Sequence, residues 1–474
     1  MTEHLRPYQE EGTAFLADMS ARPNHLLGDE PGLGKTCQAI AACDEAGAAR
    51  VLVLCLAIAK PHWQREFLRF QTMPRNVTII KSQADTVPDT GVVVVNYDLI
   101  HRQDHPLRKK LMKNRWDVLI LDESHALKNP DAKKTRWIFG VKLDGKSGLA
   151  ANSVQVFALT GTPMPNHAGE LWTHLHALAP ELIIDPVRKV PMAQHIFNER
   201  YCIQKMTPWG VKVVGSKNLS ELQGRLAKFM LRRRKKDVLK ELPPLDFAML
   251  PVDVTGSNHI PQALIDKLDE LEALWGKDVD FTDPDQIEEF FAFIQSPEGG
   301  LKISTERRVL GEIKSYLAFE VIRQDLENDP QAKIIAFCHH TRVIDLLMDQ
   351  LKAKGYHAVK IDGRSSPSQK QDAIDNFQTR PDIRVFVGQT NSAGTSVTLH
   401  ASSNVIIVEP SFVPKDNVQA ASRAHRFGQK NAVLARYLYL AGSLDELIVN
   451  TLYRKTRDIA KVLQDDVQNL GMPL

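Results

Sequence analysis

Short apolar runs, separated by helical stretches, recur in two clusters along the 474-residue chain. The first cluster comprises 51–57, 77–80, 92–97, 118–123 and 156–162, and the second comprises 333–338, 358–363, 383–390, 404–409 and 434–441. Continuous apolar runs of this length are typical of parallel strands that are buried on both faces. Two such clusters predict an α/β chain with two lobes, each a parallel sheet flanked by helices.

The region between the clusters, about 180–325, has weak strand signals. Helical patterns occupy 218–230 and 260–275, and an acidic, aromatic stretch occupies 283–294. We therefore expect helical insertions and a connector in this region. The predicted domains are lobe 1 at 1–180, a helical insertion of lobe 1 at 181–245, a connector with a helical insertion of lobe 2 at 246–325, and lobe 2 with C-terminal helices at 326–474.

The overall charge excludes a globally basic protein, because 60 Lys and Arg residues stand against 57 Asp and Glu residues, a formal net charge of +3. Any nucleic-acid surface must be a local patch. The five cysteines show no zinc-ligand spacing, and their sparse use favours reduced thiols in a cytosolic compartment. The longest apolar run, 51–59, is far shorter than the roughly 20 residues of a membrane span. We expect a cytoplasmic protein with no membrane partner.

A candidate phosphate loop, GDEPGLGKT at 28–36, precedes a helical stretch. A loop of this kind presents backbone N–H groups and the positive end of a helix to phosphates. Lys35 would reach the β- and γ-phosphates of a nucleotide, and the hydroxyl of Thr36 would ligate Mg²⁺. The strict pattern requires Gly where Asp29 stands, so this loop departs from it. The alternative is a Gly-rich helix start with an incidental Lys-Thr pair.

Two adjacent acids end an apolar run in DVLILDESH at 117–125. In an ATPase with a phosphate loop, Asp122 would hold Mg²⁺ and Glu123 would polarise the attacking water. The alternative is a strand capped by two solvated acids, which the upstream loop makes the weaker interpretation. Together the two motifs predict hydrolysis of ATP with Mg²⁺ as the cofactor.

Seven segments, which follow one another along nearly the whole chain, each resemble a motif of one protein family. They are LRPYQEEG (5–12), GDEPGLGKT (28–36), DESHALKN (122–129), LTGTPMPNHAGELW (159–172), FMLRRRKKDVLKELPP (229–244), IDGRSSPSQKQDAIDNF (361–377) and QAASRAHRFGQ (419–429). They resemble the motifs of the Swi/Snf family of helicase-like ATPases, in helicase superfamily two. The insertion at 200–222 looks closest to the annealing-helicase (HepA-related) branch. The resemblance implies two RecA-like lobes with helical insertions, and a DNA-dependent ATPase.

The resemblance also implies roles for individual residues. It assigns ATP binding to Arg6, Gln9, Asp29, Glu30, Gly32, Leu33, Gly34, Lys35 and Thr36, catalysis to Lys35, Glu123, Arg423 and Arg426, metal binding to Thr36 and Asp122, coupling to His125, Thr160 and Thr162, and nucleic-acid contact to Arg232, Arg233, Lys235, Lys236 and Arg364. Gln9 would read adenine, and the two second-lobe arginines would act as arginine fingers on the transferring phosphate.

Several of these assignments have plainer alternatives. The spacing of Arg423 and Arg426 would place both on one helix face, which without the resemblance is a solvated basic face. The basic run 228–240 would contact DNA phosphates, but a solvated helix end or a nuclear-targeting signal has the same composition. His125 would link the nucleotide site to the coupling motif, although a lone His is more often a packed residue. Trp63 could face DNA, but its helical spacing with other aromatic residues favours the core.

We expect an ATP-dependent DNA translocase that moves on duplex or branched DNA, in fork remodelling, strand annealing, roadblock removal or DNA repair. Alternatives are an ATPase that displaces or recycles a replication or transcription protein on DNA, a true strand-separating helicase, and a binding module without turnover. Intact Lys35, Glu123 and Arg426 argue against the last. Departures from the family pattern at Ser396 and Thr398 would affect rate and coupling. The compact chain indicates a minimal bacterial or phage-type form, in the cytoplasm of a bacterial cell or a phage-infected host.

Overall fold

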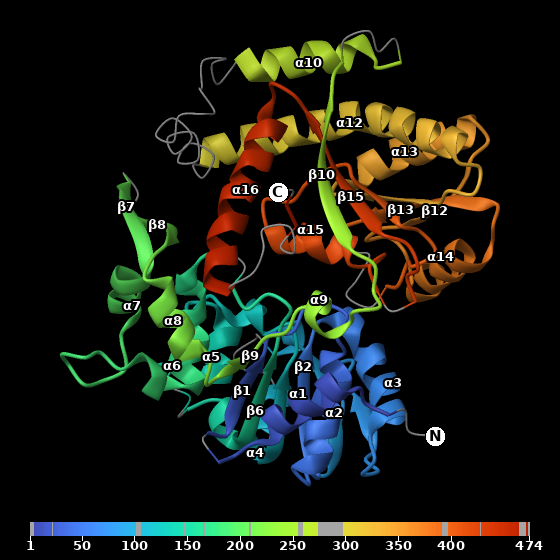
Figure 1. Cartoon of the computed structure of the whole chain (residues 1–474). Coiled ribbons are helices and arrows are strands. Elements are labelled where there is room, and N and C mark those ends of the chain that lie inside the picture. The colour runs from blue at the N-terminus through green and yellow to red at the C-terminus, as the bar shows by residue number, and fades with distance from the viewer. Residues whose placement is uncertain are drawn as a thin grey trace. The chain divides into compact units, whose positions relative to one another are not determined.

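The computed structural model of the chain describes residues 4–20, 22–100, 106–143, 145, 147–164, 166–207, 210–254, 259–273, 297–390, 397–426, 428–463 and 471–472. The chain forms two compact units whose main boundary lies between Lys240 and Glu241 (Figure 1). The acidic, aromatic stretch at 283–294 and the departure at Ser396 lie outside the described residues.

The first unit is built on a seven-stranded sheet in which every described pairing is parallel, in the order β3-β4-β2-β5-β6-β1-β9. The strands are β1 (Asn24–Leu27), β2 (Arg50–Cys55), β3 (Val77–Ile79), β4 (Gly91–Asn96), β5 (Trp116–Leu121), β6 (Ser153–Leu159) and β9 (Met230–Leu231). Parallel pairing places the carboxyl ends of these strands at one edge, where α/β folds bind their ligands.

The helices of the first unit are α1 (Pro7–Ala17), α2 (Lys35–Glu45), α3 (Lys60–Phe70), α4 (Pro106–Lys113), α5 (Lys133–Phe139), α6 (Trp172–Leu178), α7 (Gln194–Tyr201), α8 (Leu219–Leu226) and α9 (Lys235–Val238). Short 3-10 turns are η1 (Ala57–Ala59), η2 (Tyr97–Leu99), η3 (Ser124–Leu127), η4 (Ala150–Asn152), η5 (Ala168–Leu171) and η6 (Pro180–Ile183). Val51 and Val53 of β2 pack in one apolar cluster with Ile40 of α2 and with Trp63 and Phe67 of α3. Burial of this cluster holds the two helices against the sheet.

The second unit contains a six-stranded parallel sheet in the order β10-β15-β14-β11-β13-β12. Its strands are β10 (Leu245–Val252), β11 (Ile334–Cys338), β12 (His357–Ile361), β13 (Ile383–Gln389), β14 (Asn404–Ile407) and β15 (Val433–Leu440). Its helices are α10 (Gln262–Ala273), α12 (Pro297–Asn328), α13 (Thr341–Ala353), α14 (Pro367–Thr379), α15 (Pro414–Ala421) and α16 (Leu444–Leu463).

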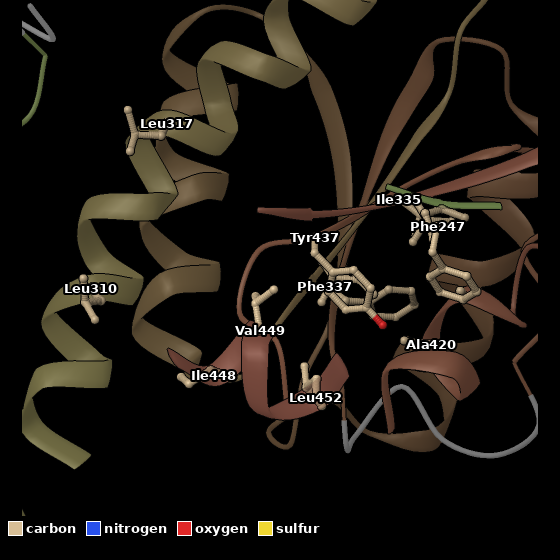
Figure 2. Close-up of a cluster of buried hydrophobic side chains, with 14 of the residues drawn as sticks. Phe247, Leu310, Leu317, Ile335, Phe337, Ala420, Tyr437, Ile448, Val449 and Leu452 are labelled. Carbon is tan, nitrogen blue, oxygen red and sulfur yellow. The ribbon is translucent and has the colours of Figure 1, made fainter. Parts of the chain in front are cut away.

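Strand β11 shows why central strands of this sheet appear in the sequence as continuous apolar runs. Successive strand residues point to opposite faces, so Ile335 and Phe337 join one cluster with Leu452 of α16 (Figure 2), while Ile334 and Ala336 join another cluster. Because helices cover both faces, every residue of β11 is buried. A two-sided core of this kind requires apolar side chains at every position.

The structure confirms a strand in each of the ten predicted runs. The insertions contain helices, as expected, but they also contain strands that were not predicted. The stretch 181–245 also contains an antiparallel hairpin of β7 (Cys202–Thr207) and β8 (Gly210–Ser216), and it contributes β9 to the first sheet. The stretch 246–325 begins within β10, which pairs with β15. β7 and β8 each carry a lysine, β9 has only two residues, and β10 is interrupted by Asp246 and Pro251, so none of them presents a continuous apolar run. Among the described residues, no helix is long and apolar enough to cross a bilayer.

Candidate nucleotide-binding site

The predicted phosphate loop connects β1 to the N-terminus of α2, at the carboxyl edge of the first sheet. Gly34 is the N-cap of α2, and its φ of +77° lies in the left-handed region that favours glycine. A Cβ atom at Gly34 would also lie 2.5 Å from Nε2 of Gln9, so a larger residue would push this side chain away. The local sequence therefore builds a loop at a helix N-terminus, which is a favourable place for phosphate.

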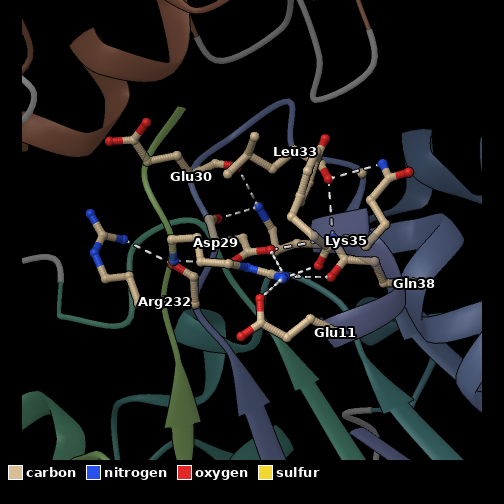
Figure 3. A network of polar contacts seen from close by, with 12 residues as sticks. Glu11, Asp29, Glu30, Leu33, Lys35, Gln38 and Arg232 are labelled. Atoms are coloured by element: carbon tan, nitrogen blue, oxygen red, sulfur yellow. Dashed lines mark hydrogen bonds and ion pairs between the residues drawn. The ribbon is translucent and has the colours of Figure 1, made fainter. Parts of the chain in front are cut away.

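Asp29, where a strict phosphate loop has glycine, holds a buried ion pair with Arg233 (Figure 3). The carboxylate is fully buried and accepts from the backbone N–H of Arg233 at 3.0 Å and from its Nε and Nη2 at 3.1 and 2.6 Å. The guanidinium also donates to Oε1 of Gln38 at 2.7 Å, to Oε2 of Glu11 at 3.1 Å and to the carbonyl of Tyr8. The Asp29 carboxylate and the Arg233 guanidinium therefore satisfy each other, and ATP binding by Asp29 and DNA contact by Arg233 stay predictions.

Two further residues of the basic segment, Arg232 and Lys235, also contact residues of the phosphate loop. Arg232 donates through Nη1 to the carbonyls of Gly28 and Gly161, at 2.9 and 3.3 Å. The backbone N–H of Lys235 donates to Oε2 of Glu30 at 2.8 Å, and Lys235 is buried. Arg232 thus contacts one carbonyl of the phosphate loop and one of the segment 159–172, and DNA contact by Arg232 and by Lys235 stays a prediction. Lys236 is exposed and stays a predicted phosphate contact.

Lys35 lies at the start of α2 and donates through Nζ to the carbonyls of Asp29 and Glu30, at 2.7 and 3.3 Å. Burial lowers the pKa of Lys35, while the negative charges of Glu123, Asp29 and Asp122 act in the opposite direction. The ammonium therefore lies within the field of the predicted catalytic acids. The next residue, Thr36, is half-buried in the first turn of the same helix.

Asp122 follows directly after β5, and two aromatic residues hold it in place. Trp63 donates its indole N–H to Oδ2 at 2.8 Å, and the hydroxyl of Tyr97 donates to the Asp122 carbonyl at 2.8 Å. Burial, with the adjacent charge of Glu123, raises the pKa of the Asp122 carboxyl above its ordinary range. Trp63 is buried, as its spacing predicts, but its hydrogen bond to the acid was not predicted. The two residues are far apart in sequence, and no local signal relates them.

Glu123 connects the acid pair to the coupling motif. It has a φ of +47°, in the left-handed region that non-glycine residues rarely adopt. Nδ1 of His125 lies 3.1 Å from Oε2 of Glu123 and 3.0 Å from Oγ1 of Thr160. Oγ1 of Thr160 in turn accepts from the backbone N–H of Thr162 at 3.1 Å. The structure thus brings together all four predicted residues, in a chain of contacts from the acid to the segment after β6.

Gln9 lies on the other side of the loop, in α1. Its Oε1 accepts from the backbone N–H of Arg6 at 2.9 Å, and its Nε2 donates to the carbonyl of Leu33 at 3.3 Å. This arrangement places Gln9 and Arg6 beside the loop, as the resemblance implies. Their contact with adenine stays a prediction.

The predicted arginine fingers lie in a turn of the second unit. Helix α15 ends at Ala421, so the prediction that a helix places Arg423 and Arg426 on one face is wrong. Nη1 of Arg426 donates to Oγ1 of Thr398 at 3.2 Å, and burial lowers the pKa of Arg426 to about 10. Arg423 is buried, which contradicts the alternative of a solvated basic face. Action on the transferring phosphate stays a prediction.

Arg364, the last predicted DNA contact, follows β12 in the second unit. It is exposed, and its Nη2 forms ion pairs with Oδ1 of Asp345 at 2.8 Å and Oδ2 of Asp362 at 2.5 Å. The two carboxylates hold the guanidinium and offset its charge. Contact with nucleic acid stays a prediction for this residue.

Known protein families match both units. The SNF2-related domain matches residues 8–259, and the helicase conserved C-terminal domain matches residues 317–428.

Individual relatives match almost the whole chain. The chain is 29% identical over 471 residues to a SWI/SNF-related matrix-associated actin-dependent regulator of chromatin subfamily A-like protein 1 homolog of Caenorhabditis elegans, with 98% of this chain and 62% of the relative covered. It is 28% identical over 461 residues to the human DNA annealing helicase and endonuclease ZRANB3, with 96% and 40% covered. It thus spans about half the length of such relatives.

A solved structure, the Sulfolobus solfataricus SWI2/SNF2 ATPase core in complex with dsDNA, matches with 20% identity and a TM-score of 0.44, covering 98% of this chain and 97% of that one.

Proposed function

The chain belongs to the SNF2-related family of helicase-like ATPases, and we propose from this that it hydrolyses ATP to move along duplex or branched DNA. The observation that carries the proposal is the set of contacts around the phosphate loop. Lys35 of the phosphate loop and the segment after β5 that carries Asp122, Glu123 and His125 lie together at the carboxyl edge of one parallel sheet. A lysine for the phosphates and acids for the metal ion and the attacking water are the groups that phosphoryl transfer to water requires.

The donor set fits a hard divalent cation. The hydroxyl of Thr36 and the carboxylate of Asp122 are oxygen ligands, which Mg²⁺ prefers. Asp122 is a buried acid with a raised pKa, and a cation beside it would favour its charged form. When bound, Mg²⁺ would neutralise charge on the β- and γ-phosphates. Trp63 keeps the carboxylate oriented by its indole hydrogen bond.

The protein groups then have separate tasks in hydrolysis. Lys35 would leave the loop carbonyls and bind phosphate oxygens. Glu123 would orient and polarise the attacking water, and His125 would report the state of Glu123 to Thr160 through its 3.1 and 3.0 Å contacts. Arg423 and Arg426 would stabilise charge that develops on the transferring phosphate.

DNA is the proposed track because the family resemblance and the name of the human relative, a DNA annealing helicase, both point to it. Movement along a duplex needs contacts to the phosphate backbone, and these are independent of sequence and sensitive to salt. Lys236 and Arg364 are the exposed predicted contacts. A bacterial or phage source, and a replication or transcription protein as a further partner, stay predictions.

Displacement of a triplex-forming third strand tests this proposal. A translocase on duplex DNA should remove the third strand in an ATP-dependent reaction and should leave a tailed partial duplex paired. The Lys35→Ala variant is the control for ATP dependence. Efficient unwinding of the tailed duplex without triplex displacement would contradict translocation and would favour strand separation.

A further inference from the structure

The β7–β8 hairpin is a two-stranded ribbon that pairs with neither large sheet in the part of the chain that the structure describes. It extends from α7 and α8 of the first unit (Figure 1). Each strand has six or seven residues, so the ribbon reaches about 20 Å from its base. An isolated two-stranded ribbon is marginally stable by itself, and its persistence requires support at the base.

Three contacts support the base of the ribbon, two to Glu221 of α8 and one to Ala168 of η5. The hydroxyl of Tyr201 donates to Oε1 of Glu221 at 2.8 Å, and Arg200 forms an ion pair with the same carboxylate at 2.9 Å. Oγ of Ser216 accepts from the backbone N–H of Ala168 at 2.9 Å. Ala168 belongs to the segment 159–172 that begins at the coupling motif. The ribbon is therefore rooted on the same segment that carries Thr160 and Thr162.

The outer part of the ribbon exposes apolar side chains. Met206 is paired with Val211 in the strand register, and the two are 82% and 60% exposed. Ile203 on the same ribbon is also exposed. Paired, exposed apolar side chains far from a core are unfavourable in water unless a partner covers them.

The charge of the ribbon indicates the partner. Residues 202–217 contain three lysines and no Asp or Glu. Lys205 and Lys217 are exposed. DNA offers a partner for each feature, because its phosphates attract the lysines and its base faces accept apolar side chains. Proteins that insert apolar side chains between base pairs combine these two features in the same way.

We propose that the β7–β8 hairpin recognises branch points in DNA, where Met206 and Val211 pack against the unstacked bases of the junction while the lysines contact the flanking phosphates. The proposal rests on the proposed action on DNA and adds the site that would distinguish branched from linear DNA. Insertion into an intact duplex requires unstacking of a base step, whereas at a junction the stacking is already broken. The hairpin therefore favours branched over linear DNA. Its root on 159–172 gives junction binding a direct path to the coupling motif.

The test compares a Met206→Glu/Val211→Glu variant with the wild type. The measurements are ATPase stimulation by a three-way fork and by a linear duplex of equal length, and fluorescence of 2-aminopurine placed at the fork. We expect at least a tenfold loss of fork stimulation, at most a twofold change with linear duplex, and loss of the 2-aminopurine signal. A Met206→Ala/Val211→Ala variant should lose the fork preference in the same direction without added charge.

The matched control is Leu68→Glu/Val187→Glu, because both residues are exposed apolar side chains on other parts of the first unit and the change in charge is the same. This variant should behave as the wild type on both substrates. Retained fork preference in the hairpin variants, or equal loss on fork and linear duplex, would overturn the proposal. A wild type without any DNA-stimulated ATPase would refute the proposed function instead, and the 2-aminopurine measurement would still decide whether the hairpin binds the fork.

Discussion

Two basic stretches of the first unit, 202–217 and 229–240, lie close in sequence but differ in the exposure of their basic side chains. The second stretch is richer in charge, yet Arg233 and Lys235 are buried. The first stretch is a ribbon with exposed lysine and apolar side chains. The second stretch meets the carboxylates of Asp29 and Glu30, while the first contains no acid of its own.

The comparison teaches that a dense basic run does not by itself indicate a surface. An arginine can be buried when a carboxylate satisfies it, and the carboxylate then depends equally on the arginine. Asp29 is the residue at which the loop departs from the strict phosphate pattern. Asp29, in place of glycine, and Arg233 of the basic run therefore have a common role. Their pairing holds the segment after β9 against the phosphate loop that follows β1.

Among the predicted variants, Glu123→Gln should have the largest effect, which is on ATP turnover. It tests whether Glu123 acts on the substrate, in contrast to Asp29, whose carboxylate pairs with Arg233. Loss of the water-polarising carboxylate should reduce turnover by roughly 10²–10⁴-fold. Binding of ATP should persist, because the phosphate loop is unchanged. Steady-state turnover and equilibrium binding of a fluorescent ATP analogue measure the two quantities. Normal turnover would remove Glu123 from the catalytic assignment.

Arg233→Ala should remove the buried ion pair that joins the stretch 229–240 to Asp29. The change leaves the Asp29 carboxylate buried without its cation, at an expected cost of about 3–5 kcal/mol in the free energy of unfolding. Arg234→Ala is the neighbouring control, since Arg234 pairs with Asp237 at the surface and should cost at most about 1 kcal/mol. Urea unfolding measures both variants. Equal, small costs would show that the Asp29–Arg233 pair does not stabilise the fold.

Trp63→Phe should test the missed contact at the acid pair. The change keeps an apolar ring and removes the indole donor to Asp122, a hydrogen bond to a charged group worth about 1.5–3 kcal/mol. We expect a raised KM for ATP with Mg²⁺ and a smaller loss of stability. A titration of turnover against Mg²⁺ at saturating ATP checks this, and an unchanged Mg²⁺ requirement would limit Trp63 to a packing role.

Salt dependence of DNA binding should give the smallest effect and should distinguish the two basic stretches directly. Lys205→Ala should reduce the slope of log K against log salt by about 1, the amount lost with one phosphate contact. Arg232→Ala should leave the slope unchanged, because its guanidinium donates to the carbonyls of Gly28 and Gly161. A lower slope for Arg232→Ala but not for Lys205→Ala would show that the stretch 229–240, and not the ribbon, contacts DNA phosphates.

The sheets were predictable from sequence where strands are buried on both faces, as the uniformly buried residues of β11 illustrate. β1 was missed because it has only four residues and begins with Asn24 and His25, so it presents no apolar run. β10 was missed because it is only partly buried. In each case tertiary pairing decided the strand, and local composition did not.

The site was predictable where a motif carries its own geometry. The loop with Lys35 and the acids after β5 lie where their patterns place them. The Asp29–Arg233 pair and the Trp63–Asp122 hydrogen bond join residues distant in sequence, and no spacing rule relates them. The helical spacing of Arg423 and Arg426 misled because α15 ends two residues before the first of them.

The most direct measurement of the central claim is ATP turnover without nucleic acid and with duplex, single-stranded, forked DNA and RNA. Wild-type turnover should rise with duplex and most with forked DNA, and Lys35→Ala should show no turnover under any condition. Turnover that is independent of DNA, or stimulated by RNA in preference to DNA, would contradict an ATPase that works on DNA.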